Sequence, residues 1–255
     1  MTTPDPLTLV RDPVSRDPLR DIALGPAWMR LVAERGEGAT LRLYRPRPTV
    51  AFSARDCLTP GIGEAVRTVR AAGFAAVRRG PGGRATAYHP GCLGLDHVSA
   101  APRGAIDIRA RFADFGELLA GALRQLGVPA GVGEVPGEYC PGEFSVHDGG
   151  GRKLVGTAQR LVPGGWLFSS MIVVTDAAAV RDVLEPAYRH LGLSWRPETV
   201  GAVEDTVSGT PVEAVADAVV AAYGARYDLV AGTVPAAVPL AAEAAVDRHR
   251  TPEPG

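Results

Sequence analysis

The segment from residue 143 to residue 174 constrains the fold of this chain more than any other. Glycine turns at 149–151 and 164–165 separate three runs of strand-forming residues, Glu143–His147, Lys153–Val162 and Trp166–Val174. Turns this short join antiparallel strands, because a parallel connection needs a crossover of about a dozen residues or more. We therefore expect an antiparallel meander in this part of the chain.

Shorter strands and several helices surround the meander. The clearest helix is Ile108–Leu126, where Phe112, Phe115, Leu119 and other apolar residues recur at helical spacing until Gly127. The pattern also predicts strands at 41–44, 49–52, 74–79, 85–88 and 93–98, and helices at 27–34, 64–72, 177–191 and 211–227. Strands and helices do not alternate regularly. The sequence therefore predicts an α+β domain with a mixed, largely antiparallel sheet and helices packed on one side.

Composition divides the chain into three parts. Residues 1–24 are rich in Pro, Asp and Arg and predict an N-terminal arm or an edge strand. Residues 25–230 hold the predicted sheet and helices. Residues 231–255 are rich in Ala and Pro, and we expect a flexible tail or a weakly docked helix.

Charge and apolar patterning exclude several classes of protein. The formal net charge of −1 predicts no general affinity for nucleic acids or anionic membranes. No run approaches the roughly 20 apolar residues that span a bilayer, and the first residues lack the apolar core of a signal peptide. We expect a cytoplasmic protein. Its three cysteines are too sparse for a disulfide framework or a zinc site, so no metal site is expected.

One lysine stands apart from the other basic residues. Lysine and arginine total 27, and Lys153 is the only lysine. In a chain that otherwise uses arginine, a retained lysine indicates a position that needs a compact ammonium with a tunable pKa rather than a planar guanidinium. The alternative is a surface lysine that has survived by chance.

The segment around Lys153 reads GRKLVGTAQR from residue 151 to residue 160. In a strand, Lys153, Thr157 and Gln159 lie on one face, and Gly156 lets another chain pass close to the sheet. An apolar strip with an ammonium near one end suits a fatty-acyl group with a polar carbonyl end. We therefore expect these four residues to line a binding site, the alternative being an edge strand with ordinary polar exposure.

A second candidate is the glycine-rich turn RRGPGGRA at 78–85, which is followed by YHPG at 88–91. Glycines between two strands let backbone N–H groups approach a ligand closely, and the arginines add positive potential for a carboxylate, a phosphate or an acidic protein. The residues that we expect to bind substrate here are Arg79, Gly82, Gly83, Arg84 and His89. The alternative is a plain hairpin turn with solvated arginines.

The third candidate is Cys140, in the loop GEYCPG at 137–142. A cysteine in a Gly/Pro loop is more accessible than a core cysteine, and a cation such as Lys153 nearby lowers the pKa of a thiol toward the reactive thiolate. The alternative is a half-buried structural thiol. Cys92 lies among apolar residues and is expected in the core.

Two of these segments resemble signatures of the lipoate/octanoate protein-ligase superfamily. RRGPGGRATAYH resembles the RRxxGGGAVYHD signature of lipoate–protein ligases and the GGRA form of related octanoyltransferases, and Arg84 stands where the ligase signature has glycine. GRKLVGTAQR resembles their GxKxxGxAQ element, whose lysine contacts the acyl carbonyl region. The order of the elements is similar over roughly residues 25–230. The resemblance implies a catalytic domain with the lipoate–protein ligase fold.

Within this superfamily, GEYCPGEFSVHDGGGRKLVGTAQR is similar to the cysteine-dependent lipoyl/octanoyl transferase branch. This likeness implies that Cys140 is the nucleophile and that Lys153 orients the acyl carbonyl and favours the thiolate. It implies transfer of an octanoyl or lipoyl group from acyl carrier protein or glycine cleavage H protein, with no cofactor. The implied acceptor is a lysine of a lipoyl-domain protein, such as H protein or a 2-oxoacid dehydrogenase E2 subunit.

Two alternatives stay open. An ATP-dependent lipoate–protein ligase would use ATP and Mg to make an acyl-adenylate, with Arg78, Arg79 and the Gly82–Gly83 turn at the phosphates and no need for Cys140. A non-catalytic relative would bind octanoate or lipoate and leave an acceptor domain unmodified.

Overall fold

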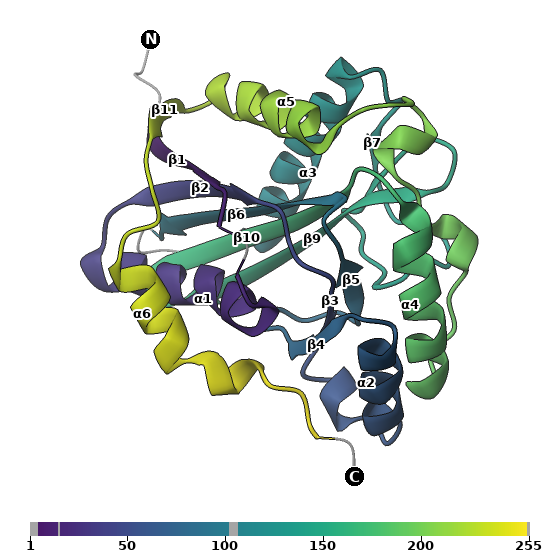
Figure 1. Cartoon of the computed structure of the whole chain (residues 1–255). Coiled ribbons are helices and arrows are strands. Elements are labelled where there is room, and N and C mark those ends of the chain that lie inside the picture. The colour runs from purple at the N-terminus through teal and green to yellow at the C-terminus, as the bar shows by residue number, and fades with distance from the viewer. Residues whose placement is uncertain (1–4, 15, 102–106, 254–255) are drawn as a thin grey trace.

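The computed structural model describes residues 5–14, 16–101 and 107–253 (Figure 1). The strands are β1 Pro6–Asp12, β2 Ala39–Tyr44, β3 Thr49–Phe52, β4 Ala75–Arg78, β5 Thr86–Tyr88, β6 Cys92–Ala100, β7 Gly131–Val132, β8 Val146–His147, β9 Lys153–Val162, β10 Gly165–Val173 and β11 Asp228–Ala231. The α-helices are α1 Pro18–Arg35, α2 Ile62–Ala71, α3 Ile108–Gln125, α4 Ala177–His190, α5 Val212–Gly224 and α6 Ala237–Ala244. No helix in the described ranges has the length and apolarity that a membrane span requires.

The described strands form one large sheet and one small sheet. The large sheet has the order β11-β1-β2-β6-β10-β9-β8-β7, and the small sheet has the order β4-β3-β5. In the large sheet β1 runs parallel to both of its neighbours, and the other pairs are antiparallel. Strands β9 and β10 are the predicted meander, with Gly165 paired to Val162 across a tight turn. The predicted α+β class with a mixed, largely antiparallel sheet is confirmed.

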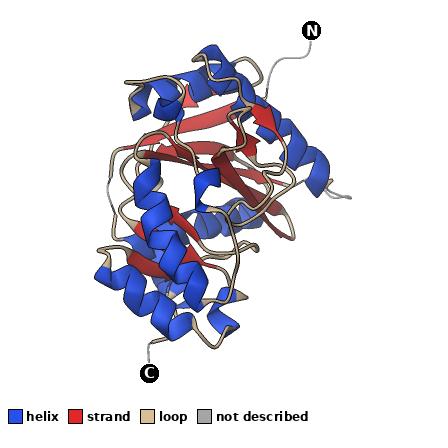
Figure 2. Ribbon diagram, turned by 90° about the vertical axis from the view of Figure 1, so that its right-hand side faces the viewer, coloured by secondary structure: helices blue, strands red, loops and turns tan. Residues whose placement is uncertain are grey.

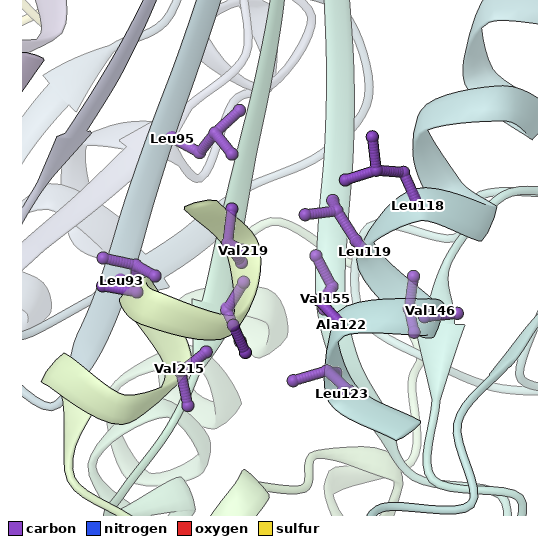
Figure 3. Close-up of a cluster of buried hydrophobic side chains, with 14 of the residues drawn as sticks. Leu93, Leu95, Leu118, Leu119, Ala122, Leu123, Val146, Val155, Val215 and Val219 are labelled. Carbon is purple, nitrogen blue, oxygen red and sulfur yellow. The ribbon is translucent and has the colours of Figure 1, made fainter. Parts of the chain in front are cut away.

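Helices α3 and α5 cover one face of the large sheet. Leu118, Leu119, Ala122 and Leu123 of α3 point toward the sheet, as does Val219 of α5 (Figure 3). They meet apolar side chains of β6 and β9, such as Leu95 and Val155, all of them buried. This core explains the helical spacing of apolar residues in α3, because one face of that helix is removed from water.

Helices α1 and α6 cover the opposite face, so the helices lie on both sides of the large sheet rather than on one (Figures 1 and 2). Ala27 and Met29 of α1 pack with Val98 of β6, Leu167 of β10 and Val238 of α6. Helices α2 and α4 pack on each other beside the small sheet. The sheet is therefore a middle layer between two layers of helix.

Helix α1 begins nine residues before the predicted start at Ala27. Asp17 accepts a hydrogen bond from the backbone N–H of Leu19 at 3.0 Å, and Pro18 occupies the first helical position. An Asp-Pro pair of this kind is a regular helix start, because proline has no N–H to leave unpaired there. Pro26 lies inside the helix.

The segments at both ends of the chain hold more regular structure than their composition indicated. Strand β1 lies between β2 and β11 and is not an edge strand. Residues 231–255 were expected to be flexible or weakly docked, and within them α6 packs against α1. The expected strand Glu143–His147 is regular only at Val146–His147. The division of the chain at residues 24 and 230 stays a prediction.

Candidate active site

A cavity of about 470 Å³ opens between α1, the glycine-rich hairpin at 79–83, the loop at 139–145 and the sheet. Its floor comes from β9 and β10, where Gly156, Ala158 and Met171 line it, and α1 contributes Ile22 and Pro26. Further apolar lining comes from Phe112, Phe144 and Leu167. The cavity also holds Cys140 and Lys153. An apolar cavity with a few polar groups is typical of a small-molecule site.

The glycine-rich hairpin and the Cys140 loop meet at one atom, the sulfur of Cys140. Arg79 donates from Nη2 to Cys140 Sγ at 3.1 Å, and the backbone N–H of Arg84 donates to the same sulfur at 3.3 Å. Arg79 is almost fully buried, and the same Nη2 also donates to the carbonyl of Arg84 at 2.7 Å. Two segments that lie some sixty residues apart in sequence thus place a cation and a backbone donor on one thiol.

These contacts change the acidity of the thiol. Burial by itself would raise the pKa of Cys140, but the positive charges of Arg79 and then of Lys153, together with the two hydrogen bonds to sulfur, hold that pKa below the value of an ordinary thiol. Burial raises the pKa of Cys57, and it raises the pKa of Cys92 to about 12. Cys140 is therefore the cysteine whose surroundings favour the nucleophilic thiolate.

The backbone of Cys140 adopts a left-handed conformation, with φ of 42°, which is costly for a residue with a side chain. Its N–H donates to the phenol oxygen of Tyr188 at 2.8 Å, and the Tyr188 hydroxyl donates to the carbonyl of Ala85 at 2.8 Å. Tyr188 lies on α4 and is buried. This one hydroxyl therefore ties the Cys140 loop to the end of the glycine-rich hairpin.

Gly83 leaves the space in which the sulfur sits. A side chain at this position would place Cβ 2.8 Å from Cys140 Sγ and 2.5 Å from Arg79 Nη2, and the backbone φ of 93° also favours glycine. The neighbouring Gly82 lines the same cavity, but a Cβ there would meet no atom within 4 Å. Position 83 therefore requires glycine, whereas position 82 has room for a side chain.

Lys153 lies beneath the Cys140 loop with its ammonium buried. Its Nζ lies 2.9 Å from Glu138 Oε2 and donates to the carbonyls of Tyr139 and Cys140 at 3.1 and 3.0 Å. The structure thus brings Lys153 and Cys140 together, as expected from the sequence. Gly156 lies against this side chain, since a Cβ there would be 3.5 Å from Lys153 Cε.

The other expected site residues fall into two groups. Thr157 and Gln159 line the cavity, and their side chains bond to the carbonyls of Phe144 and Ile108. The side chain of Arg84 turns away and pairs with the buried carboxylate of Asp56 at 3.2 Å. What Arg84 offers the site is its backbone N–H.

His89 does not reach the cavity. It is buried at the end of β5, where Nδ1 accepts a hydrogen bond from the backbone N–H of Gly91 at 3.1 Å. Burial lowers the pKa of His89, so its ring is neutral near pH 7. The structure therefore keeps this histidine apart from Cys140 and Lys153.

Sequence reasoning missed two residues that organise the site. Glu138 precedes the cysteine in the GEYCPG loop, and its carboxylate is completely buried beside Lys153. The sequence feature that could have indicated this role is the position of Glu138, two residues before the candidate nucleophile. Tyr188 had no such signal, because α4 reaches Cys140 only through the three-dimensional fold.

Comparison with known protein families gives this geometry a context. The model of the lipoyl protein ligase A/B catalytic domain matches residues 17–224, which is most of the chain. The chain belongs to this family. The predicted membership of the lipoate/octanoate protein-ligase superfamily is confirmed.

The curated relatives carry a more specific name within this family. An octanoyl-GcvH:protein N-octanoyltransferase of Geobacillus kaustophilus is 29% identical over 176 residues, which cover 69% of this chain and 62% of the relative. The enzyme of the same name from Exiguobacterium sibiricum is 27% identical over 209 residues, covering 78% of this chain and 75% of the relative. This chain thus spans less than two thirds of the Geobacillus relative.

Solved structures of lipoate–protein ligases have the same fold. Lipoate-protein ligase A bound with ATP superposes with a TM-score of 0.78 at 20% identity, covering 97% of this chain and 95% of that one. The bipartite lipoate protein ligase of Thermoplasma acidophilum gives a TM-score of 0.73 at 21% identity, with coverage of 97% and 93%. At this identity the likeness concerns the fold.

The contacts of Arg79 generate a prediction about acidity. Arg79→Met removes the cation nearest the sulfur, so the pKa of Cys140 rises and its alkylation by iodoacetamide at pH 7 slows several-fold. At high pH the variant and wild-type rates converge, because both thiols are then ionised. Mass spectrometry of the Cys140 peptide across a pH series measures this. Arg78→Met, at the adjacent exposed arginine, is the control and should leave the profile unchanged. An unchanged profile for Arg79→Met would show that another group activates the thiol.

The two glycines of the hairpin generate a second prediction. Gly83→Ala places a methyl group against both Cys140 Sγ and Arg79 Nη2, so these two atoms must separate and the alkylation rate of Cys140 at pH 7 should fall several-fold. Gly82→Ala meets open space and should retain the wild-type alkylation rate. Equal rates for the two variants would contradict the predicted position of the sulfur.

Proposed function

We propose that this protein is an acyltransferase that moves an octanoyl or lipoyl group onto a protein lysine through a thioester on Cys140. The observation that carries the proposal is the pair of donors on Cys140 Sγ, Arg79 Nη2 at 3.1 Å and Arg84 N–H at 3.3 Å, at the wall of an apolar cavity. A structural thiol has no need of a buried guanidinium, whereas a nucleophilic thiolate is stabilised by one.

The names of the relatives support the same chemistry. Each name gives octanoyl-GcvH and a protein as the two substrates of an N-octanoyltransferase. An octanoyl tail is apolar, and it matches the apolar lining from Ile22, Phe112, Phe144, Leu167 and Met171. We propose octanoyl-H protein as donor, with acyl carrier protein as the alternative donor, and a lipoyl-domain lysine as acceptor, in H protein or a 2-oxoacid dehydrogenase E2 subunit.

The proposed reaction has two steps. In the first, the Cys140 thiolate attacks the acyl carbonyl carbon, a C–S bond forms, and the bond from that carbon to the donor breaks. From octanoyl-H protein the leaving group is a lysine amine, which takes up a proton; from acyl carrier protein it is a thiolate. In the second, a neutral lysine amine of the acceptor attacks the thioester, an amide forms, the amine loses a proton and the Cys140 thiolate is restored.

The residues around the sulfur have separate roles in these steps. Arg79 stabilises Cys140 Sγ as a thiolate, both when it attacks the donor and when it leaves the thioester. In each tetrahedral intermediate, the Arg79 charge and the Arg84 N–H stabilise the carbonyl oxygen that becomes negative. Gly83 keeps this region free of side-chain atoms. The reaction needs no cofactor, because the energy of the acyl bond passes through the thioester. We propose that it takes place in the cytoplasm, where thiols stay reduced.

The ATP-dependent ligase is the main alternative, because solved structures of lipoate–protein ligases share this fold. A ligase makes an acyl-adenylate and leaves Cys140 without a covalent role. The presence of an activated thiol in the cavity favours the transferase. The requirement for ATP separates the two.

Incubation with an octanoyl donor should therefore give an enzyme whose intact mass is increased by one octanoyl group. Because the link is a thioester, hydroxylamine should remove it, and Cys140→Ala should neither form it nor transfer octanoate. Cys57→Ala, which removes a thiol of raised pKa, is the matched control and should form the adduct. Normal transfer by Cys140→Ala together with a requirement for ATP would refute the transferase proposal.

A further inference from the structure

The ammonium of Lys153 has no N–H left for a substrate. A lysine ammonium has three donors. In this structure they face Glu138 Oε2 at 2.9 Å, the carbonyl of Tyr139 at 3.1 Å and the carbonyl of Cys140 at 3.0 Å. The three partners belong to three consecutive residues, and the last of them is the candidate nucleophile Cys140. The side chain of Lys153 is only 2% exposed, so water does not compete for these donors.

Glu138 is the centre to which the loop is bound. Its Oε1 accepts hydrogen bonds from the backbone N–H groups of Val135 at 3.3 Å and Gly142 at 3.1 Å. The hydroxyl of Ser145 lies 3.1 Å from Oε1 and 2.8 Å from Oε2. The carboxylate is therefore bonded to residues before and after Cys140 as well as to Lys153. A buried carboxylate is tolerated only where it is paired and hydrogen-bonded in this way.

The loop needs such support because Cys140 holds an unfavourable backbone conformation. A left-handed φ of 42° costs about 1–2 kcal/mol in a residue with a side chain. Lys153 is fixed at the start of β9, where its backbone pairs with His147 and forms a bridge to Val200. The sheet thus supplies a rigid attachment point, and the Glu138–Lys153 pair transmits its position to the loop.

We infer that Glu138 is a positioning residue for acyl transfer: it holds the Lys153 ammonium against the carbonyl of Cys140 and so fixes the sulfur opposite Arg79 and the Arg84 N–H. This inference rests on the proposed function, in that the sulfur is the atom that accepts the acyl group. It assigns Lys153 a role in shaping the loop, and it leaves contact with the acyl carbonyl to Arg79 and Arg84.

Loss of the Glu138 carboxylate acts on the Cys140 thiol in two opposed ways. The negative charge of Glu138 offsets the positive charge of Lys153, and the cation that acts most strongly on the sulfur is Arg79. Glu138→Gln removes the offsetting charge while keeping an acceptor oxygen for the loop. The lost negative charge lowers the pKa of Cys140, whereas any displacement of the sulfur from Arg79 raises it. Glu138→Gln is therefore judged by its transfer kinetics, and the pH profile is read in Ser145→Ala, a variant in which no charge changes.

The test uses the full chain and four variants: Glu138→Gln, Lys153→Met, the double variant and, as control, Glu134→Gln. Glu134 is exposed and lies four residues earlier in the same segment. We expect Glu138→Gln to lower kcat for octanoyl transfer about 10- to 100-fold with the KM for the donor within about twofold. Glu134→Gln should match the wild type in both kcat and KM.

The double variant decides whether Glu138 acts through Lys153. If it does, the kcat of the double variant should lie within about threefold of the kcat of the slower single variant, because the interaction is already lost in each single variant. Multiplied losses in kcat would overturn the inference, and so would a wild-type kcat for Glu138→Gln.

Two further measurements keep the test decisive. Ser145→Ala removes a hydrogen-bond donor to the Glu138 carboxylate without changing its charge, and it remains informative if Glu138→Gln does not fold. It should lower kcat several-fold and move the alkylation midpoint to higher pH, because the sulfur is displaced from Arg79. An unchanged kcat for Ser145→Ala would then count against the inference. Alkylation needs no acyl donor. A wild-type protein that transfers no octanoyl group refutes the proposed function, whereas the alkylation profiles still judge the role of Glu138.

Discussion

The buried pair of Lys153 and Glu138 is the interaction on which the geometry of the site depends. It joins the first residue of β9 to a loop that has almost no regular structure. Breaking one partner would leave a buried charge uncompensated, which is among the most costly changes in a protein interior. The pair thus fixes an otherwise irregular loop, and with it a cysteine in a strained backbone conformation. The sheet thus holds the loop through Lys153, and α4 holds it through Tyr188.

Around that pair, the fold places a second cation, Arg79, in contact with the sulfur. Arg79 follows β4 of the small sheet, and Lys153 begins β9 of the large sheet. Tyr188 of α4 connects the two segments through one hydroxyl. The reactive sulfur therefore lies where the two sheets meet, with an apolar cavity beside it. This arrangement suits an acyl group whose carbonyl end needs polar contacts and whose tail needs none.

Much of the fold and part of the candidate site could be predicted from local sequence. The β9–β10 meander, the helix α3 and the cavity-lining positions of Lys153 and Gly156 all follow from periodicity, glycine turns and a single lysine. The contact of Arg79 with sulfur could not be predicted in this way, since it depends on the relative placement of two sheets. The same holds for Tyr188. His89 illustrates the opposite case, because its place in the motif indicated a site residue and the turn at Gly91 directs its ring into the protein interior.

The central claim is that Cys140 carries the acyl group as a true intermediate, and a single-turnover experiment tests it most directly. Octanoyl enzyme is prepared, freed of donor and mixed with a lipoyl domain in the absence of ATP. The account predicts that the octanoyl group leaves Cys140 and appears on the acceptor lysine at least as fast as steady-state turnover. An adduct that persists, or that releases free octanoate while the lipoyl domain stays unmodified, would contradict it.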